Sequence, residues 1–504
     1  MARKICVLVL STLFATSLYS QKTLQLEECR QMAIAHNKSI QIAQENVKVA
    51  QQYKQAAFTQ FFPNFSANAA YTWNQKSISL LADDAYLPVY SLNANGTPNY
   101  PASWNNSWTV VNGTPVPLDA NGKPFNPSTS PDKIEWKNKA LLPKEAMEFD
   151  MKNVFVGTIG FTQPIFMGGK IKALYDIAKY GEHLASAQQE NKMTELLLEV
   201  DEDYWRVVSL ESKVTLAKEY RGLIAKMDSD IRTMVDEGVA TKADALKVRV
   251  KLNEADVALT KAEDGLNLSR MALNQVCGMP LDEQYRLADQ SLDTKAVEPQ
   301  LIPIDQALAN RPEIKALTQM QSIAKANQKA MLSRFLPNIA LTGNYLVSNP
   351  NSFNGFETKF GGMFTVGVVA NIPLFHFGDK LHTLNAAKSQ YRIATLQLEE
   401  AKEKMELQIK QSSYKTAESI KKQTTTQHNI DQAVENLRYA TEGFEAGVIT
   451  STDLLAAQTA WLSAKSENID AIIDVKLCNL YLEKSLGTLK APATNNTIKN
   501  NQTH

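Results

Sequence analysis

The sequence predicts an α+β membrane protein that combines short strands with very long helices. Three observations predict this class. The chain repeats itself, with the same motifs in the same order. Each copy has two segments in which apolar and polar residues alternate, as they do in half-exposed strands. Each copy also has a stretch of about 70 residues without proline, in which apolar residues recur every three or four positions, the pattern of a coiled coil.

Composition narrows the class further. The 504 residues carry 53 Lys plus Arg and 53 Asp plus Glu, so the formal net charge is zero. A neutral chain has no field that gathers polyanions, and we expect no nucleic-acid partner. Beyond the first twenty residues no apolar run reaches the length of a transmembrane helix. Contact with a membrane must therefore be made by strands.

The N-terminus has the pattern of a secretory signal. Arg3 and Lys4 precede an apolar run over residues 5–18, and Ser20 follows. This order predicts a signal peptide over residues 1–20 and export of the chain. Three cysteines remain after it, Cys29, Cys277 and Cys478, and we expect buried thiols because they lie far apart within helical patterns. No lipid-anchor motif precedes any of them.

The repeat defines the domain organisation. FFPN at Phe61 returns as FLPN at Phe335, 274 residues later, and EGVATKAD around Gly238 returns as AGVITSTD, 209 residues later. The first copy therefore carries about 65 extra residues. We expect a first repeat over 21–278, a linker over 279–303, a second repeat over 304–487 and a disordered tail over 488–504.

The extra residues form a segment over 74–150 that holds nine of the nineteen prolines, together with Trp104, Trp108 and Trp136. Proline at this density excludes a long helix or a central strand, so we expect a long loop. This loop is either folded on the surface or disordered, and both alternatives remain open.

Four strands are expected, over about 65–73, 153–163, 339–347 and 363–372. One phase is the more apolar of the two: Phe65, Tyr71, Trp73, Phe155, Ile159, Phe161, Ile339, Leu341, Tyr345, Val347, Phe364, Val366 and Val368. The opposite phase is small or polar: Ser66, Asn68, Thr72, Thr158, Gly160, Thr342, Asn344, Thr365 and Gly367. Strands of this length suit a tilted crossing of a bilayer, where only a closed barrel pairs every backbone group. A soluble sandwich is the alternative, but the rest of each copy offers no second sheet.

Two helical hairpins follow, over 170–276 with a tip near 238–244, and over 380–486 with a tip near 447–453. The first arm spans roughly 100 Å at about 1.5 Å per residue. Gly238 has the position of a glycine that ends a helix. The return arm is only about half as long, so we expect the leading helices, from Glu27 to Gln60 and from Asp305 to Arg334, to cover the rest of the apolar seam. Four strands cannot enclose a channel, so oligomerisation is required.

Several motifs together resemble the TolC family of outer-membrane efflux channels. They are LEECRQMAIAHNKSI with its copy IDQALANRPEI, FFPN with FLPN, QPIFMGGK with IPLFHFGDK, EGVATKAD with AGVITSTD, and the closing SLGTL. The resemblance covers nearly the whole mature chain. It implies a homotrimer whose 12-stranded barrel, with four strands per chain, lies in outer-membrane lipid and is continued by a tube of 12 helices in the periplasm. It also implies a passive exit in a tripartite efflux or type I secretion system, where a periplasmic adaptor (membrane fusion protein) and an inner-membrane pump deliver the substrate.

The resemblance also implies a periplasmic gate. Asp453 matches the position of a ring of three aspartates, whose mutual repulsion would raise one pKa or hold a cation. The family's second acidic ring, its tyrosine and its arginine are replaced by Ala456, Phe444 and Ile449. We therefore expect the gate to be held closed by apolar packing of Phe444 and Ile449, or by Asp453 alone. The alternative is that Asp453 only caps the return helix, as Asp244 does in the first copy.

The two tips are the expected docking points for the adaptor. Their residues are Gly238, Thr241, Asp244, Gly447, Thr450 and Asp453. The simpler explanation of the glycines is that they form the turns.

No enzyme motif is expected to function. FMGGK at Phe166 lacks the first glycine of a phosphate loop, and the six histidines have no paired metal-binding spacing. We expect no catalytic residue, cofactor or metal. The competing function is a non-conducting coiled-coil scaffold that spans the envelope, which the small or polar phase of the strands disfavours. The transported substrate cannot be read from the sequence.

Overall fold

A computed structural model of the chain describes residues 23–88, 91–92, 94–95, 98–99, 108–118, 121–126, 128–129, 139–289 and 302–490. Its contacts divide the chain into a helical unit and a strand unit, and each unit takes residues from both halves of the sequence. The strand unit comprises residues 60–167 and 337–372. The predicted signal peptide, 1–20, and all but three residues of the predicted tail, 488–504, lie outside the described residues.

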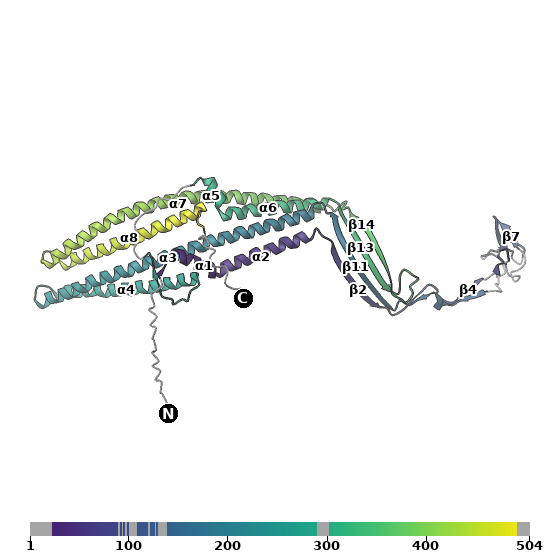
Figure 1. Cartoon of the computed structure of the whole chain (residues 1–504), viewed down its shortest axis with the longest axis horizontal. Coiled ribbons are helices and arrows are strands. Elements are labelled where there is room, and N and C mark those ends of the chain that lie inside the picture. Colours follow the sequence, from purple (N-terminus) through teal and green to yellow (C-terminus); the bar gives the residue numbers. More distant parts are fainter. Residues whose placement is uncertain are drawn as a thin grey trace, which may run out of the picture. The chain divides into compact units, whose positions relative to one another are not determined.

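The strand unit is built on one four-stranded antiparallel sheet (Figure 1). Its strands are β2 (Asn64–Trp73), β11 (Asn153–Phe166), β13 (Asn338–Asn349) and β14 (Gly361–Asn371). They have 10, 14, 12 and 11 residues, and the order across the sheet is β14-β13-β11-β2. In the described part of the chain, β2 and β14 each have only one neighbour, so the sheet has two open edges.

The register places the two sequence phases on opposite faces. Ile159 lies opposite Ala67 on β2 and Tyr345 on β13, and Tyr345 in turn lies opposite Phe364. Thr158 lies opposite Asn68, and Asn344 lies opposite both Gly160 and Thr365. Because side chains alternate along a strand, the aromatic residues share one face, and most of the polar residues lie on the other. That second face also carries five larger apolar residues, Val154, Val156, Leu346, Met363 and Val369.

The segment over 74–150 contains more strand than expected from its prolines. Within the described residues, short two-stranded ribbons form between β3 (Ile78–Ser79) and β10 (Glu148–Phe149) and between β4 (Ala85–Pro88) and β9 (Lys139–Leu142). Two further ribbons pair β5 (Ser91–Leu92) with β6 (Pro98–Asn99) and β7 (Trp108–Val111) with β8 (Thr114–Pro117). A short 3₁₀ helix, η1, covers Lys144–Met147. Proline is compatible with such two-stranded ribbons because both strands are edges. Trp104 and Trp136 lie outside the described residues.

Two very long helices organise the helical unit. These are α3 (Lys170–Asp236) and α7 (Asp379–Glu445), and each has 67 residues. The return helices α4 (Lys242–Cys277) and α8 (Ser451–Leu486) have 36 residues each. Figure 1 shows α4 and α2 (Lys38–Thr59) beside successive stretches of α3, with α1 (Leu26–His36) between them. In the second half α8, α5 (Ile304–Asn310) and α6 (Pro312–Leu332) pack on α7 in the same manner.

The leading helices are not continuous, which corrects the expectation of one helix in each copy. The first is interrupted at Asn37 and the second at Arg311, both with ψ of 125°. Arg311 precedes Pro312, and a residue before proline disfavours helical ψ. At Asn37 the side-chain Oδ1 accepts a hydrogen bond of 2.8 Å from the backbone N–H of Ser39, which starts the next helix.

Two glycines pack on these breaks. Gly278 ends α4 with φ of 74°, and a Cβ atom there would lie 2.5 Å from Cβ of His36. Gly487 ends α8 with φ of 67°, and a Cβ atom there would lie 2.8 Å from Cβ of Asn310. Glycine is therefore required twice at each position, for its backbone angle and for its lack of a side chain.

The core follows the predicted seam along α3. Leu197, Val200, Tyr204 and Val207 are buried in the middle of the helix, and Tyr220, Ile224, Met227 and Ile231 are buried toward its end. The first group packs with residues from α1, α4 and the β1–β12 pair (Thr23–Leu24 with Arg286–Leu287). The second packs with α4, α7 and α8. Cys29 and Cys277 are free, buried thiols in the core around the middle of α3, as predicted. Cys478 is also free, but it is only half-buried.

None of the described helices has both the length and the apolar content needed to cross a bilayer.

Candidate functional site

All the predicted site residues lie at the tips of the two helical hairpins. The first turn lies between α3 and α4, and its Gly238 has φ of 81°; the second lies between α7 and α8, and its Gly447 has φ of 71°. Val239 N donates to Met234 O at 2.9 Å, and Val448 N donates to Gly443 O at 2.8 Å. These bonds satisfy carbonyl groups at the helix ends, and they need a left-handed residue at the glycine position.

Each return helix begins with the same cap. Thr241 Oγ1 accepts a hydrogen bond from Asp244 N at 3.2 Å, and the hydroxyl donates to Asp244 Oδ2 at 2.6 Å. Thr450 Oγ1 accepts from Asp453 N at 3.2 Å, and its hydroxyl donates to Asp453 Oδ2 at 2.7 Å. In the second copy Thr450 N also donates to Asp453 Oδ2 at 3.2 Å, which completes a capping box.

Hydrogen bonds from the cap residues lower the pKa of both carboxyl groups. For Asp453 the Thr450 hydroxyl is the main cause and the Thr450 backbone N–H adds to it. For Asp244 the Thr241 hydroxyl is again the main cause, and Lys247, whose Nζ lies 3.5 Å from Oδ1, contributes. Within one chain, Asp453 is thus an ionised cap residue. The raised pKa expected for Asp453 requires three copies of the carboxyl group to meet, and it stays a prediction.

The three predicted gate residues lie in two environments. Phe444 is 7% exposed and Ile449 is half-buried, and both pack in one cluster with Leu454 and Trp461 of α8. Ile449 also closes over Gly443, where a Cβ atom would lie 3.3 Å from its Cγ2. The two apolar residues are therefore brought together, and Asp453 is held separately at the exposed start of α8.

The predicted docking residues are accessible. Gly238, Thr241, Gly447, Thr450 and Asp453 are exposed, and Asp244 is half-buried.

Sequence reasoning missed the most exposed apolar residues of the tips. Val239 is 69% exposed and Val448 is 78% exposed, each directly after the turn glycine. Single exposed apolar residues are common on protein surfaces, but here a valine occupies the same position in both tips. The signal was present, because EGVAT and AGVIT both place valine after glycine.

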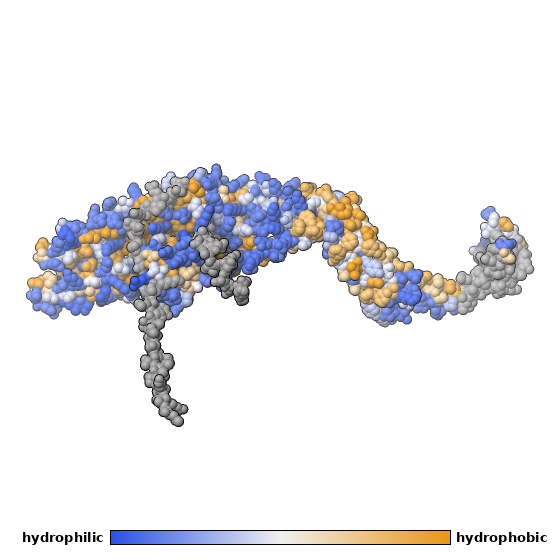
Figure 2. All heavy atoms as spheres, in the orientation of Figure 1, coloured by the Kyte–Doolittle hydropathy of each residue, from blue (hydrophilic) through white to orange (hydrophobic). Residues whose placement is uncertain are grey.

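The apolar face of the sheet is the second candidate site. Its large side chains are mostly exposed in the single chain: Phe65 is 72% exposed, Ile159 64% and Phe364 62%. Figure 2 shows apolar residues gathered over the sheet, whereas the helical unit presents mainly hydrophilic residues with apolar seams between them. Exposed apolar surface of this extent is typical of a face that meets lipid or another protein.

Among the described residues no group of His, Cys, Asp and Glu has the arrangement of a metal site.

Comparison with known proteins identifies the class. The family model described as "Outer membrane efflux protein" matches residues 144–279 and 303–488, and the chain belongs to this family. The chain is similar to the alkaline protease secretion protein AprF of Pseudomonas aeruginosa, with 23% identity over 64% of this chain and 67% of the relative. It is also similar to the outer membrane protein TolC of Escherichia coli, with 20% identity over 71% of this chain and 77% of the relative.

Solved structures agree on the fold. The outer membrane protein VceC of Vibrio cholerae matches with a TM-score of 0.67 and 15% sequence identity, over 92% of this chain and 96% of that chain. Family membership confirms the resemblance to TolC-like channels and the predicted location, the outer membrane with an extension into the periplasm. The family consists of channel proteins, so the chain is not an enzyme.

Proposed function

We propose that this protein is the outer-membrane channel of a tripartite efflux or type I secretion system. In this role it gives passive exit to substrates that an inner-membrane pump delivers through a periplasmic adaptor. The observation that carries the proposal is the register of the sheet, which gathers the aromatic residues on one face and most of the polar residues on the other. Such a sheet suits lipid on one side and a water-filled lumen on the other.

The proposed assembly is a homotrimer: the two open edges support pairing between copies, and the resemblance to TolC-like channels supports the number three. When β2 of one copy pairs with β14 of the next, three copies close a barrel of 12 strands, and no edge remains unpaired. The outer faces of two helices support the same assembly, because their apolar residues are exposed in one chain: Leu246, Val250, Val257 and Leu268 on α4, and Ile393, Leu396, Leu407 and Tyr414 on α7. Packing α4 of one copy against α7 of the next would bury both sets.

The internal duplication remains an inference, and the equal lengths of paired helices support it. The long helices have 67 residues each, and the return helices have 36 each. Each hairpin has two helical arms, so three chains with two similar hairpins each would give a tube of 12 helices. Such a tube would have approximate sixfold symmetry. The caps of the two tips differ in one hydrogen bond, from Thr450 N to Asp453 Oδ2, which completes the capping box in the second tip.

The tips are the proposed site of gating and docking. Phe444 and Ile449 would hold the second hairpin closed through apolar packing, with Asp453 near the axis. The adaptor would contact Val239, Val448 and the adjacent glycines, which are exposed in both hairpins. Untwisting of the hairpins would then open the tube without breaking covalent structure.

Conductance through planar bilayers tests the channel. Asn344→Cys places a thiol on the polar face, and Tyr345→Cys places one on the apolar face of the same strand. A charged, water-soluble thiol reagent should change the single-channel conductance of the Asn344→Cys protein and leave that of the Tyr345→Cys protein unchanged. The unsubstituted protein, treated in the same way, controls for the native cysteines. Equal effects at both positions would contradict the assignment of the polar face to the lumen. No conductance after the tips are opened by mutation would favour the scaffold function instead.

Cargo is not specified by the chain. The name of AprF refers to secretion of a protease, whereas the family description refers to efflux. The partner pump sets the substrate in either case. Cross-linking at Gly447 followed by identification of the attached protein would name the adaptor and, through it, the pump.

A further inference from the structure

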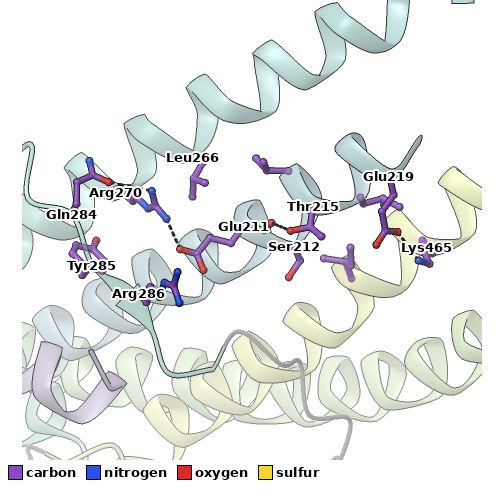
Figure 3. Close-up of a pocket in the computed structure, with 13 residues that line it drawn as sticks. Glu211, Ser212, Thr215, Glu219, Leu266, Arg270, Gln284, Tyr285, Arg286 and Lys465 are labelled. Carbon is purple, nitrogen blue, oxygen red and sulfur yellow. Dashed lines mark hydrogen bonds and ion pairs between the residues drawn. The ribbon is translucent and has the colours of Figure 1, made fainter. Parts of the chain in front are cut away.

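A cavity of about 670 Å³ opens on the helical unit between α3, α4, α8 and the segment at residues 284–286 (Figure 3). We call it the α3–α4–α8 pocket. Cavities of this size are typical of sites for small organic ligands. The pocket lies away from both tips and contains none of the residues assigned to gating or docking.

Two ion pairs frame the pocket. In Figure 3, Arg270 and Glu211 meet near Gln284 and Tyr285, while Glu219 and Lys465 meet at the other end. Arg270 Nη2 donates to Glu211 Oε1 at 2.7 Å, and Lys465 Nζ donates to Glu219 Oε2 at 2.9 Å. Both carboxylates are therefore already neutralised by a cation.

Two buried donors of the pocket have no hydrogen-bond acceptor in the described part of the chain. They are the hydroxyl of Tyr285, whose residue is only 2% exposed, and Nε of Arg270. Burial raises the pKa of Tyr285, so its hydroxyl keeps the proton and remains a donor. A buried donor without an acceptor is unfavourable, and phenylalanine would fill the same apolar space without that penalty.

A third donor faces the same space. Arg286 is exposed, lines the pocket, and forms no ion pair with any residue that the structure describes. Arg270, Arg286 and Lys465 exceed the two carboxylates by one positive charge. Leu266 and Ile469 also line the pocket and are apolar.

We propose that the α3–α4–α8 pocket binds an oxyanion, a carboxylate or phosphate, carried by a small amphipathic molecule. The anion accepts hydrogen bonds from Tyr285, from Nε of Arg270 and from the guanidinium group of Arg286. The apolar part of the ligand packs on Leu266 and Ile469. Charge-assisted bonds from arginine are the strongest hydrogen bonds available to such an anion. This site goes beyond the proposed channel function, and its binding can be measured without conduction.

Isothermal titration calorimetry on the full-length, detergent-solubilised protein tests this site at constant ionic strength. The probes are hexanoate, acetate and inorganic phosphate, with hexan-1-ol as the uncharged control. We expect hexanoate or phosphate to bind with a Kd of about 1 mM or tighter, which is reasonable for so few ligand atoms. Tighter binding of hexanoate than of acetate identifies an amphipathic carboxylate, and binding of phosphate alone identifies a phosphate group.

Two variants locate the binding. Tyr285→Phe removes only the hydroxyl, and Arg286→Gln removes the exposed charge. Each variant should raise the Kd for the anion at least about tenfold. The matched controls are Tyr481→Phe, whose hydroxyl donates to Glu202 outside the pocket, and Arg392→Gln on α7; both should bind as the unsubstituted protein does. Without ligand, Tyr285→Phe should unfold at the same temperature or a higher one. Absence of anion binding up to 20 times the expected Kd, equal binding of hexan-1-ol, or unchanged affinity in both variants would overturn the proposal.

Discussion

Asp453 accepts a hydrogen bond from the hydroxyl of Thr450 at 2.7 Å, and the two residues close the first turn of α8. Asp244 and Thr241 make the equivalent bond at 2.6 Å in the first hairpin. The two tips thus have chemically matched caps, although only Asp453 matches the family's ring position. Because of this match, Asp244 can serve as a control that separates the capping role of Asp453 from its proposed role in the gate.

The first prediction uses the two aspartates as a matched pair. Asp453→Ala and Asp244→Ala each remove a cap, so both should lower the thermal unfolding midpoint by a similar, small amount. Only Asp453→Ala should weaken block of the channel by polyvalent cations, by roughly tenfold, since one carboxylate per chain leaves the axis. Single-channel recording with a trivalent cation measures this. Unchanged block in Asp453→Ala would leave that residue with the cap role alone.

The second prediction concerns acid. Hydrogen bonds lower the pKa of Asp453 and Asp244 in the folded chain, whereas an unfolded aspartate titrates near pH 4. A depressed pKa stabilises the folded state above the unfolded pKa, and this contribution disappears as the pH falls through the folded value. Protection of the tip amides from hydrogen exchange should therefore be constant from neutral pH to about pH 5 and decrease below about pH 4. In Thr450→Val the second tip should lose most of this dependence.

The third prediction concerns a buried ion pair between α1 and α3. Arg30 Nε donates to Asp201 Oδ1 at 2.8 Å, and a second bond joins Nη2 to Oδ2. The Asp201 side chain is only 3% exposed, and its burial raises its pKa even though Arg30 opposes this effect. Arg30→Met leaves a buried carboxylate unpaired and should reduce the free energy of unfolding by about 3 kcal/mol.

Urea denaturation in detergent measures the ion pair. The double variant Arg30→Met with Asp201→Leu should recover most of the lost stability, because no buried charge remains. Lys48→Met, which breaks the exposed pair with Glu45, should have almost no effect. Equal losses in the single and double variants would show that shape, rather than charge, makes Arg30 necessary.

The fourth prediction compares four glycines with positive φ. A Cβ atom at Gly238 or Gly447 would meet nothing within 4 Å, so alanine there should cost only the backbone strain of about 1 kcal/mol. At Gly278 and Gly487 the Cβ atom would also collide with His36 and Asn310, which should add about 1–3 kcal/mol. Denaturation curves of the four alanine variants check this order. Equal losses at all four positions would mean that the helix breaks relax around the added methyl group.

Much of the fold could be predicted from the sequence because its signals are local. Gly238 and Thr241 mark the end of one helix and the start of the next, and the structure has both in these roles. Alternation along the strands predicted which residues share a face, and the observed register agrees. The break before Pro312 could also have been predicted, since the residue before a proline disfavours helix. The break at Asn37 depends on a side-chain hydrogen bond and has a weaker signal.

The candidate sites were less accessible to sequence reasoning. Arg30 and Asp201 are 171 residues apart, and no periodicity connects them. Phe444 and Ile449 were predicted as one group with Asp453, yet packing draws the two apolar residues into the core and leaves the carboxylate on the cap. The α3–α4–α8 pocket draws residues from three helices and a connecting segment, so its donors meet only in the folded chain.

The two unpaired edges of the sheet constrain how the protein reaches its place in the membrane. A lone copy would present rows of backbone N–H and C=O groups to hydrocarbon along β2 and β14, and hydrocarbon offers them no hydrogen bonds. For the proposed barrel, insertion and assembly must therefore be coupled, so that only a closed ring of copies enters the bilayer.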